Sequence, residues 1–135
     1  MKYGGTLRYY GPGEMDHVDP ACAYYTFSHQ VIRLFSRQLY GYPTTVDDTA
    51  LEPVADVAAG PPSVSADARR YVIRLREGVE WDTTPSRQVT AQDFIRGFKR
   101  MCNPVVAAGA IGYYTSTIAG MAEFAEGYRT VEHTA

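Results

Sequence analysis

Three carboxylates and a histidine, side chains that bind metals or transfer protons, lie close together near the start of the chain. They are Glu14, Asp16, His17 and Asp19. Their spacing fits no standard metal site, because an EF-hand needs a longer regular run of ligands that ends in glutamate. Glycine, proline and aspartate recur over residues 11–20 and forbid a regular element. We therefore expect a loop here and no metal site.

The chain carries no recognisable motif of an enzyme active site. It has neither a glycine-rich phosphate loop followed by Lys-Ser/Thr nor a Gly-x-Ser-x-Gly elbow. Its three histidines lack the spacing of zinc ligands. A catalytic triad is assembled in space, so the sequence alone does not exclude one. On balance these residues favour a binding module, not an enzyme, and predict no cofactor.

The two cysteines, Cys22 and Cys102, are too few for a disulfide scaffold and lack metal-ligand spacing. In an oxidising compartment they could bridge each other. The plainer interpretation is a pair of buried free thiols.

Composition describes an ordinary globular protein. A length of 135 residues allows one domain with a modest core, and 45% of the residues are hydrophobic. The net charge of −2 gives no argument for nucleic acid or an anionic membrane. No run of 18 apolar residues predicts a membrane span. The eleven tyrosines suit either β-structure or a wet ligand surface.

The elements that must position any site are clearest between Tyr71 and Asn103. Apolar and polar residues alternate over residues 71–76, which predicts a strand with one buried face. After a polar turn, Thr90 and Asp93 have the spacing of a capping box at the start of a helix. Asn103 precedes a proline, which ends that helix.

Other elements are predicted with weaker signals. A short strand is expected within residues 4–11, and a helix over 26–40 that Thr26 or Ser28 caps. The core-facing residues of that helix are expected to be Val31, Leu34, Phe35 and Leu39.

Further along, residues 51–59 favour a short helix, and residues 63–66 a strand that forms a hairpin with 71–76. Residues 105–120 are expected to be irregular or only partly helical, and residues 121–128 a last short helix. The predicted fold class is therefore α/β, with mixed helices and strands.

The order of these segments resembles the extracellular solute-binding protein family 5, the peptide-, oligopeptide- and nickel-binding receptors of bacterial ABC importers. In that family a Leu-x-Pro-x-Leu-Ala segment precedes a hairpin whose second strand reads Tyr-x-Phe-x-Leu-Arg-x-Gly-Val-x-(Phe/Trp). A helix beginning Val-Thr-Ala-x-Asp follows. The matching residues are Leu51, Pro53, Val57, Ala58, Tyr71, Ile73, Leu75, Arg76, Gly78, Val79, Trp81, Val89, Thr90, Ala91 and Asp93.

The resemblance covers nearly the whole chain, with two departures. Residues 83–88 form a slightly longer turn without the Gly-x-Pro of the family, and Val57 replaces a commoner leucine. Family members are also much longer and have two lobes. The resemblance thus implies that residues 1–135 are an N-terminal segment of the first lobe of a periplasmic-binding-protein-like fold (class II), with residues 43–103 as a subdomain.

For function, the resemblance implies a monomeric receptor that binds a peptide or similar solute and delivers it to a membrane permease. Such a protein acts outside the cytoplasmic membrane, in the periplasm or as a cell-surface lipoprotein, although no signal peptide is visible at the start of this chain. Glu14 would accept from a ligand amine or amide, with Met15 as an adaptable apolar contact. Tyr113 or Tyr114 would be the aromatic residue that reaches the ligand.

Two other interpretations stay open. The chain could be a truncated or remnant domain that binds no ligand by itself. It could also be an enzyme or regulatory domain on a similar α/β unit, which would hold a self-contained pocket with converging titratable groups.

Overall fold

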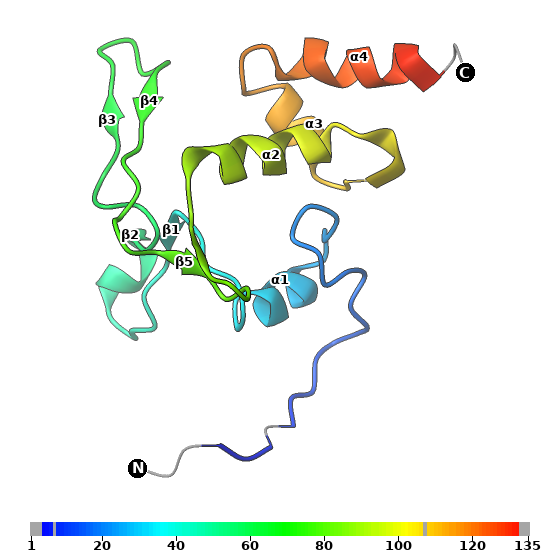
Figure 1. Cartoon of the computed structure of the whole chain (residues 1–135). Coiled ribbons are helices and arrows are strands. Elements are labelled where there is room, and N and C mark those ends of the chain that lie inside the picture. Colours follow the sequence, from blue (N-terminus) through cyan, green and yellow to red (C-terminus); the bar gives the residue numbers. More distant parts are fainter. Residues whose placement is uncertain (1–3, 7, 107, 133–135) are drawn as a thin grey trace. The chain divides into compact units, whose positions relative to one another are not determined.

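The computed structural model describes residues 4–6, 8–106 and 108–132 of the chain (Figure 1). These residues form a mixture of helices and short antiparallel strands. The chain divides into two compact units, one made of Met1–Phe35 with Lys99–Ala135 and the other of Ser36–Phe98. The relation to a two-lobed receptor and the subdomain over residues 43–103 stay predictions.

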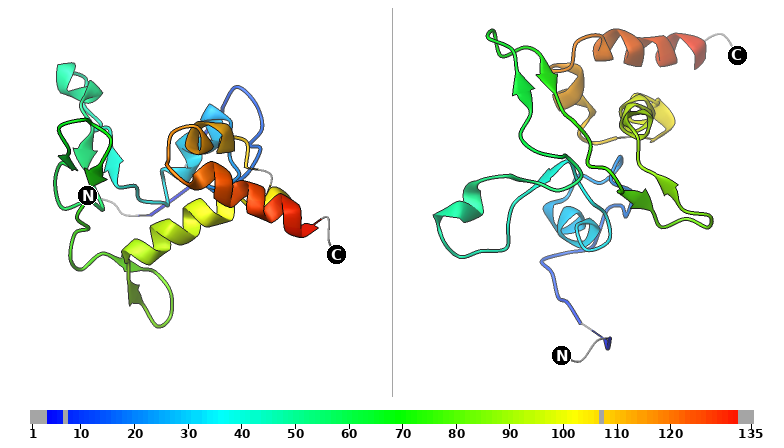
Figure 2. Two further views of the ribbon diagram at one scale, coloured as in Figure 1. Left: turned by 90° about the horizontal axis from the view of Figure 1, so that it is seen from above. Right: turned by 60° about the vertical axis from the view of Figure 1, so that its left-hand side comes forward.

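The Ser36–Phe98 unit contains every strand of the described residues, in three two-stranded antiparallel sheets. The pairs are β1 (Tyr40–Gly41) with β2 (Val54–Ala55), β3 (Ser63–Val64) with β4 (Tyr71–Val72), and β5 (Glu80–Trp81) with β6 (Arg87–Gln88). A short 3-10 helix, η1 (Asp48–Leu51), lies between β1 and β2 along the chain. Within this unit the β3–β4 and β5–β6 hairpins point in different directions (Figure 2).

The predicted hairpin is confirmed, because β3 pairs with β4. Nearer its base the amide of Ala59 donates to the carbonyl of Arg74 at 2.8 Å, so the two arms remain paired beyond the strands. Gly60-Pro61-Pro62 separates Ala59 from β3, whereas Ile73 alone separates β4 from Arg74. The first arm therefore bulges, at a point where two prolines have no amide to contribute to the pairing.

Helix α2 (Ala91–Met101) forms where the capping signal predicts it. The Asp93 carboxylate accepts from the amide of Thr90 at 2.9 Å. The Thr90 hydroxyl donates to the same carboxylate at 3.3 Å instead of accepting from the Asp93 amide, so only half of the predicted capping box forms. Arg87 adds two hydrogen bonds to Asp93, at 2.7 and 3.0 Å, and ties β6 to the start of the helix.

The unit made of Met1–Phe35 and Lys99–Ala135 is helical. Its elements are α1 (Thr26–Ile32), η2 (Pro104–Val106), α3 (Ile111–Thr115) and α4 (Met121–Glu132). The irregular segment and the last helix are confirmed, although α4 continues beyond its predicted end. The buried side chains of this unit are Cys22, Ala23, Ser28, Ile32, Cys102, Ala108 and Met121.

The strand predicted over residues 4–11 is wrong for the described part of that range. Residues 4–6 and 8–11 belong to no strand, and Leu7 lies outside the described residues. Gly4 and Gly5 have φ angles of 91° and 115°, which lie outside the β region. The alternation of apolar and polar residues is not enough to form a strand where no partner strand pairs with the segment.

The helix predicted over residues 26–40 is too long. Helix α1 ends at Ile32, and the chain then enters β1. Leu34 and Phe35, two of the predicted core residues, are exposed. The buried face of α1 consists of Ser28 and Ile32 instead, one helical turn apart.

The helix predicted over residues 51–59 is also wrong. Only Leu51 is helical, as the last residue of η1, and the following residues enter β2. Val54 pairs with Gly41 and Ala55 with Tyr40. Here a pairing between distant segments overrides the local preference for helix.

Candidate ligand site

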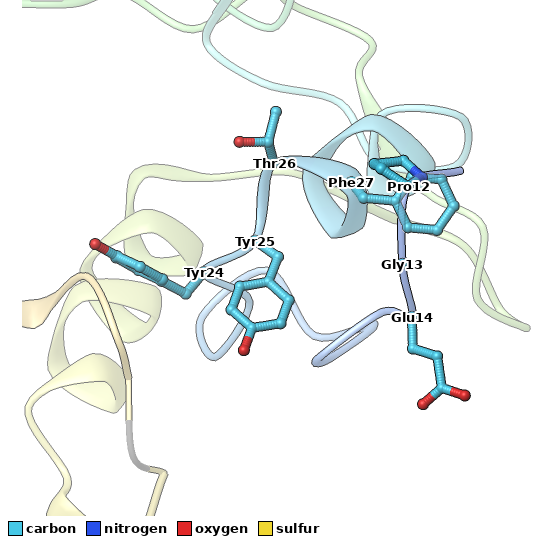
Figure 3. A pocket seen from close by; sticks show the side chains of 7 residues that line it. All are labelled: Pro12, Gly13, Glu14, Tyr24, Tyr25, Thr26 and Phe27. Atoms are coloured by element: carbon cyan, nitrogen blue, oxygen red, sulfur yellow. The ribbon is translucent and has the colours of Figure 1, made fainter.

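A pocket of about 410 Å³ lies where the loop after Gly11 meets the start of α1 (Figure 3). Both segments belong to the helical unit. The lining residues are Pro12, Gly13, Glu14, Tyr24, Tyr25, Thr26 and Phe27. Three of them are aromatic and one is acidic, so the pocket offers apolar walls and one negative charge.

Glu14 supplies that charge. Its side chain is exposed and forms no hydrogen bond or ion pair with any residue that the structure describes. In Figure 3 the ring of Tyr25 lies between Glu14 and Tyr24, and its hydroxyl points to the same side as the Glu14 carboxylate. Over the same described residues the hydroxyls of Tyr24 and Tyr25 make no hydrogen bond, so these polar groups are available to a ligand.

Asp16 fixes the backbone beneath the pocket. Its carboxylate accepts from the Ser28 hydroxyl and from the amides of Tyr24 and Tyr25, the last two at 2.6 and 3.3 Å. The Asp16 amide in turn donates to the Ser28 hydroxyl oxygen at 3.1 Å. Neither Thr26 nor Ser28 caps α1 as predicted, since its N-cap residue is Tyr25 and no side chain makes a capping hydrogen bond there. Asp16 instead holds Tyr24 and Tyr25, the two residues directly before the helix.

These contacts stabilise the charged form of Asp16. The Ser28 hydroxyl holds the pKa of the Asp16 carboxyl well below its usual range, and the Tyr24 amide adds to this effect against the opposing effect of burial. Asp16 is therefore a charged structural group, and its acceptor sites are used within the protein.

Gly11 permits the aromatic wall at Phe27. A Cβ atom at Gly11 would lie 2.1 Å from Cε2 of the Phe27 ring, so any other residue would displace that ring. Tyr9 stacks on Phe27 with ring centroids 5.7 Å apart, and its hydroxyl donates to Gln30 of α1 at 3.1 Å. The ring thus lies between the N-terminal segment and the helix.

The segment after α2 supports the other end of the pocket. A Cβ atom at Gly109 would lie 3.0 Å from Cβ of Tyr24, so the small residue allows the backbone to approach. The Cys22 thiol donates to the carbonyl of Val106 at 3.2 Å. Cys22 and Cys102 are both buried cysteines outside any disulfide, and burial raises the pKa of each thiol.

Asp19 and Arg100 form a second link between the same two segments. The guanidinium of Arg100 donates to both oxygens of Asp19, one of them at 2.9 Å. The Asp19 carboxylate also accepts from the amide of Ala21 at 3.0 Å. Chiefly because of Arg100, the pKa of the Asp19 carboxyl is lowered from 3.8 to about 2.

Replacing Arg100 by glutamine should return the pKa of Asp19 toward its ordinary value, measured by a carbon-detected NMR titration of the carboxyl group. Since the folded state favours the carboxylate, this pair stabilises the protein above pH 3.8, and its contribution disappears as the pH falls through about 2. Partial solvent exposure limits the contribution to about 1 kcal/mol. The Arg8→Gln variant, which removes an exposed positive charge elsewhere, should leave the Asp19 titration unchanged. An unchanged midpoint in the Arg100 variant would contradict the pairing.

The residues predicted to contact ligand are only partly brought together. Glu14 lines the pocket, while the half-buried Met15 beside it does not. Tyr113 and Tyr114 lie on α3, exposed and outside the lining. No group of three or more potential metal ligands occurs among the described residues.

Of the seven lining residues only Glu14 was predicted, and sequence reasoning missed all three aromatic ones, Tyr24, Tyr25 and Phe27. The available signal was an aromatic run directly before a predicted helix in a tyrosine-rich chain. It became informative only once Asp16 was known to hold that run beside Glu14.

Comparisons of the chain with protein-family models, with curated proteins and with solved structures found no match. Across the residues that the structure describes, no helix combines the length and the apolar character needed to cross a membrane.

Proposed function

We propose that this chain is the ligand-binding segment of a substrate-binding protein of an ABC importer, which captures peptides or similar solutes outside the cytoplasmic membrane. It acts as a monomer and passes its solute to a membrane permease. It catalyses no reaction and needs no cofactor. The proposal starts from the resemblance of residues 51–93 to the solute-binding motifs described above.

One observation supports it most directly. Glu14, which the resemblance assigns to ligand contact, lines a pocket with three aromatic side chains and has no partner among the described residues. An acid that merely solubilised a loop would not need aromatic neighbours held in place by hydrogen bonds to Asp16. A largely apolar pocket with a few polar groups is the usual form of a small-ligand site.

The chemistry of the pocket suits a ligand with an ammonium group or a peptide amide. The Glu14 carboxylate accepts a charge-assisted hydrogen bond from either donor. Tyr24 and Tyr25 offer ring faces to apolar parts of the ligand and hydroxyls to its polar parts. Recognition of this kind reads the common features of peptides and tolerates varied side chains, with water filling unused space.

Glu14→Gln should weaken binding of trialanine about tenfold, because the variant keeps the shape of the side chain and loses its charge. Binding is measured by NMR titration, with amide shifts expected in residues 13–27. Acetylated trialanine, which lacks the ammonium group, should bind wild type more weakly and respond less to Glu14→Gln. The matched variant Glu77→Gln, at an exposed acid outside the pocket, should bind like wild type.

Two results would count against the proposal. One is the absence of any shift in residues 13–27 at millimolar peptide. The other is an equal loss of affinity in the Glu14 and Glu77 variants, which would indicate attraction by overall charge rather than by a site.

A further inference from the structure

The β3–β4 hairpin concentrates positive charge in a chain whose net charge is −2. From Ser63 to Arg76 the sequence contains one aspartate and four arginines, a local net charge of +3. The four are Arg69, Arg70, Arg74 and Arg76. This hairpin is therefore strongly basic, although the chain as a whole carries a small negative charge.

Three of these arginines are not neutralised within the part of the chain that the structure describes. None of them forms an ion pair there. Arg76 reaches back to the carbonyl of Ala55 at 3.4 Å. The exposed side chains of Arg69, Arg70 and Arg74 make no hydrogen bond to a described residue, so three guanidinium groups are free to bind an anion.

Asp67, the one acidic residue between Ser63 and Arg76, stabilises the turn of the hairpin. Asp67 accepts from the hydroxyl of Ser65 at 2.6 Å and from the amide of Arg69 at 3.2 Å. Ala68 next to it has a φ of 55°, as a tight turn requires. The turn lies at the end of the hairpin far from β1 and β2 (Figure 1). Arg69 and Arg70 thus directly follow a firmly closed turn, and Arg74 and Arg76 lie beyond β4, nearer the base of the hairpin.

Apolar side chains are exposed on both faces of the same hairpin. Val64 and Tyr71 are directly paired, so they share one face, with exposed fractions of 49% and 59%. Val72, the next residue along the strand, points to the opposite face and is 48% exposed. A partner that covered one face alone would leave apolar surface on the other in water.

We propose that the β3–β4 hairpin docks on an anionic membrane surface. Guanidinium groups bind lipid phosphates, and the negative potential of the surface attracts clustered arginines. Tyrosine is suited to the boundary between headgroups and acyl chains, because its ring is apolar and its hydroxyl is polar. A lipid interface also surrounds an inserted hairpin, which accounts for apolar residues on both faces better than a flat protein surface does. This proposal does not depend on solute binding at the Glu14 pocket.

The full chain should sediment with vesicles of phosphatidylcholine containing 30% phosphatidylglycerol, and not with phosphatidylcholine alone. Each arginine near such a surface contributes about fivefold in partitioning, so the double variant Arg70→Gln/Arg74→Gln should bind about 25-fold more weakly. The double variant Arg8→Gln/Arg96→Gln loses the same charge from exposed positions outside the hairpin. It should bind within about twofold of wild type, because neither residue belongs to the hairpin that contacts the lipid.

A lysine pair distinguishes lipid from protein as the partner. Arg70→Lys/Arg74→Lys should retain vesicle binding, because membrane attraction depends mainly on charge, whereas bidentate pairing with protein carboxylates requires arginine. Equal binding to neutral and anionic vesicles, or equal losses in the hairpin and control variants, would overturn the proposal. Binding to polyglutamate without binding to anionic vesicles would also overturn it, because the partner of the hairpin would then be an acidic protein.

Discussion

Ile32→Ala should lower the free energy of unfolding by about 3 kcal/mol, whereas Leu34→Ala, two residues later, should change it by less than about 0.5 kcal/mol. Ile32 is 2% exposed and Leu34 is 76% exposed. Truncation of a buried isoleucine leaves a cavity, while truncation of an exposed leucine removes few contacts. The measurement is urea unfolding followed by far-ultraviolet circular dichroism, since the only tryptophan, Trp81, belongs to the other unit.

This pair of variants separates two accounts of α1. The hydrophobic pattern of the sequence makes Leu34 a core residue, and the structure makes Ile32 one in its place. If Leu34→Ala proved as costly as Ile32→Ala, the helix would have to continue beyond its observed end, and the exposed position of Leu34 would be wrong.

Ser28→Val should also destabilise the protein by about 3 kcal/mol. The hydroxyl of Ser28 donates to one oxygen of Asp16 and accepts from its amide, so the variant loses two hydrogen bonds of about 1 kcal/mol each. The side chain is fully buried, and the larger valine adds strain by overpacking, again about 1 kcal/mol or more. Chemical denaturation gives the difference in unfolding free energy.

Two companion variants divide this effect into its parts. Ser28→Ala loses the hydrogen bonds without the added volume and should cost about 2 kcal/mol. Ser63→Val makes the same replacement at an exposed position in β3 and should stay within about 0.5 kcal/mol of wild type. A Ser28→Val variant as stable as Ser63→Val would refute a structural contact between Ser28 and Asp16.

Elements were predictable where their signals are local. Helix α2 has its capping residues, Thr90 and Asp93, within its own first turn, and the β3–β4 hairpin is encoded by two short runs and the turn between them. Such signals need no information from distant parts of the chain. Both elements formed where the sequence placed them.

Predictions failed where distant segments decide the structure. The start of α1 is stabilised by Asp16, twelve residues before Ser28, and the end of the predicted helix is lost to the β1–β2 pairing. The candidate site depends on the same long-range contacts. Glu14 was proposed from a resemblance, but its aromatic neighbours Tyr24 and Tyr25 lie beside it only because their amides bind Asp16.

The bulge at Gly60-Pro61-Pro62 has a consequence for association between copies of the chain. An exposed strand edge can recruit another strand, and this is a common start of aggregation. At the bulge two successive residues have no amide hydrogen, and the carbonyl of Gly60 already accepts from the Tyr40 hydroxyl at 3.0 Å. Pro61 and Pro62 therefore offer a second chain no amide donors, and the Gly60 carbonyl is already used, so this stretch of the first strand's edge resists edge-to-edge growth.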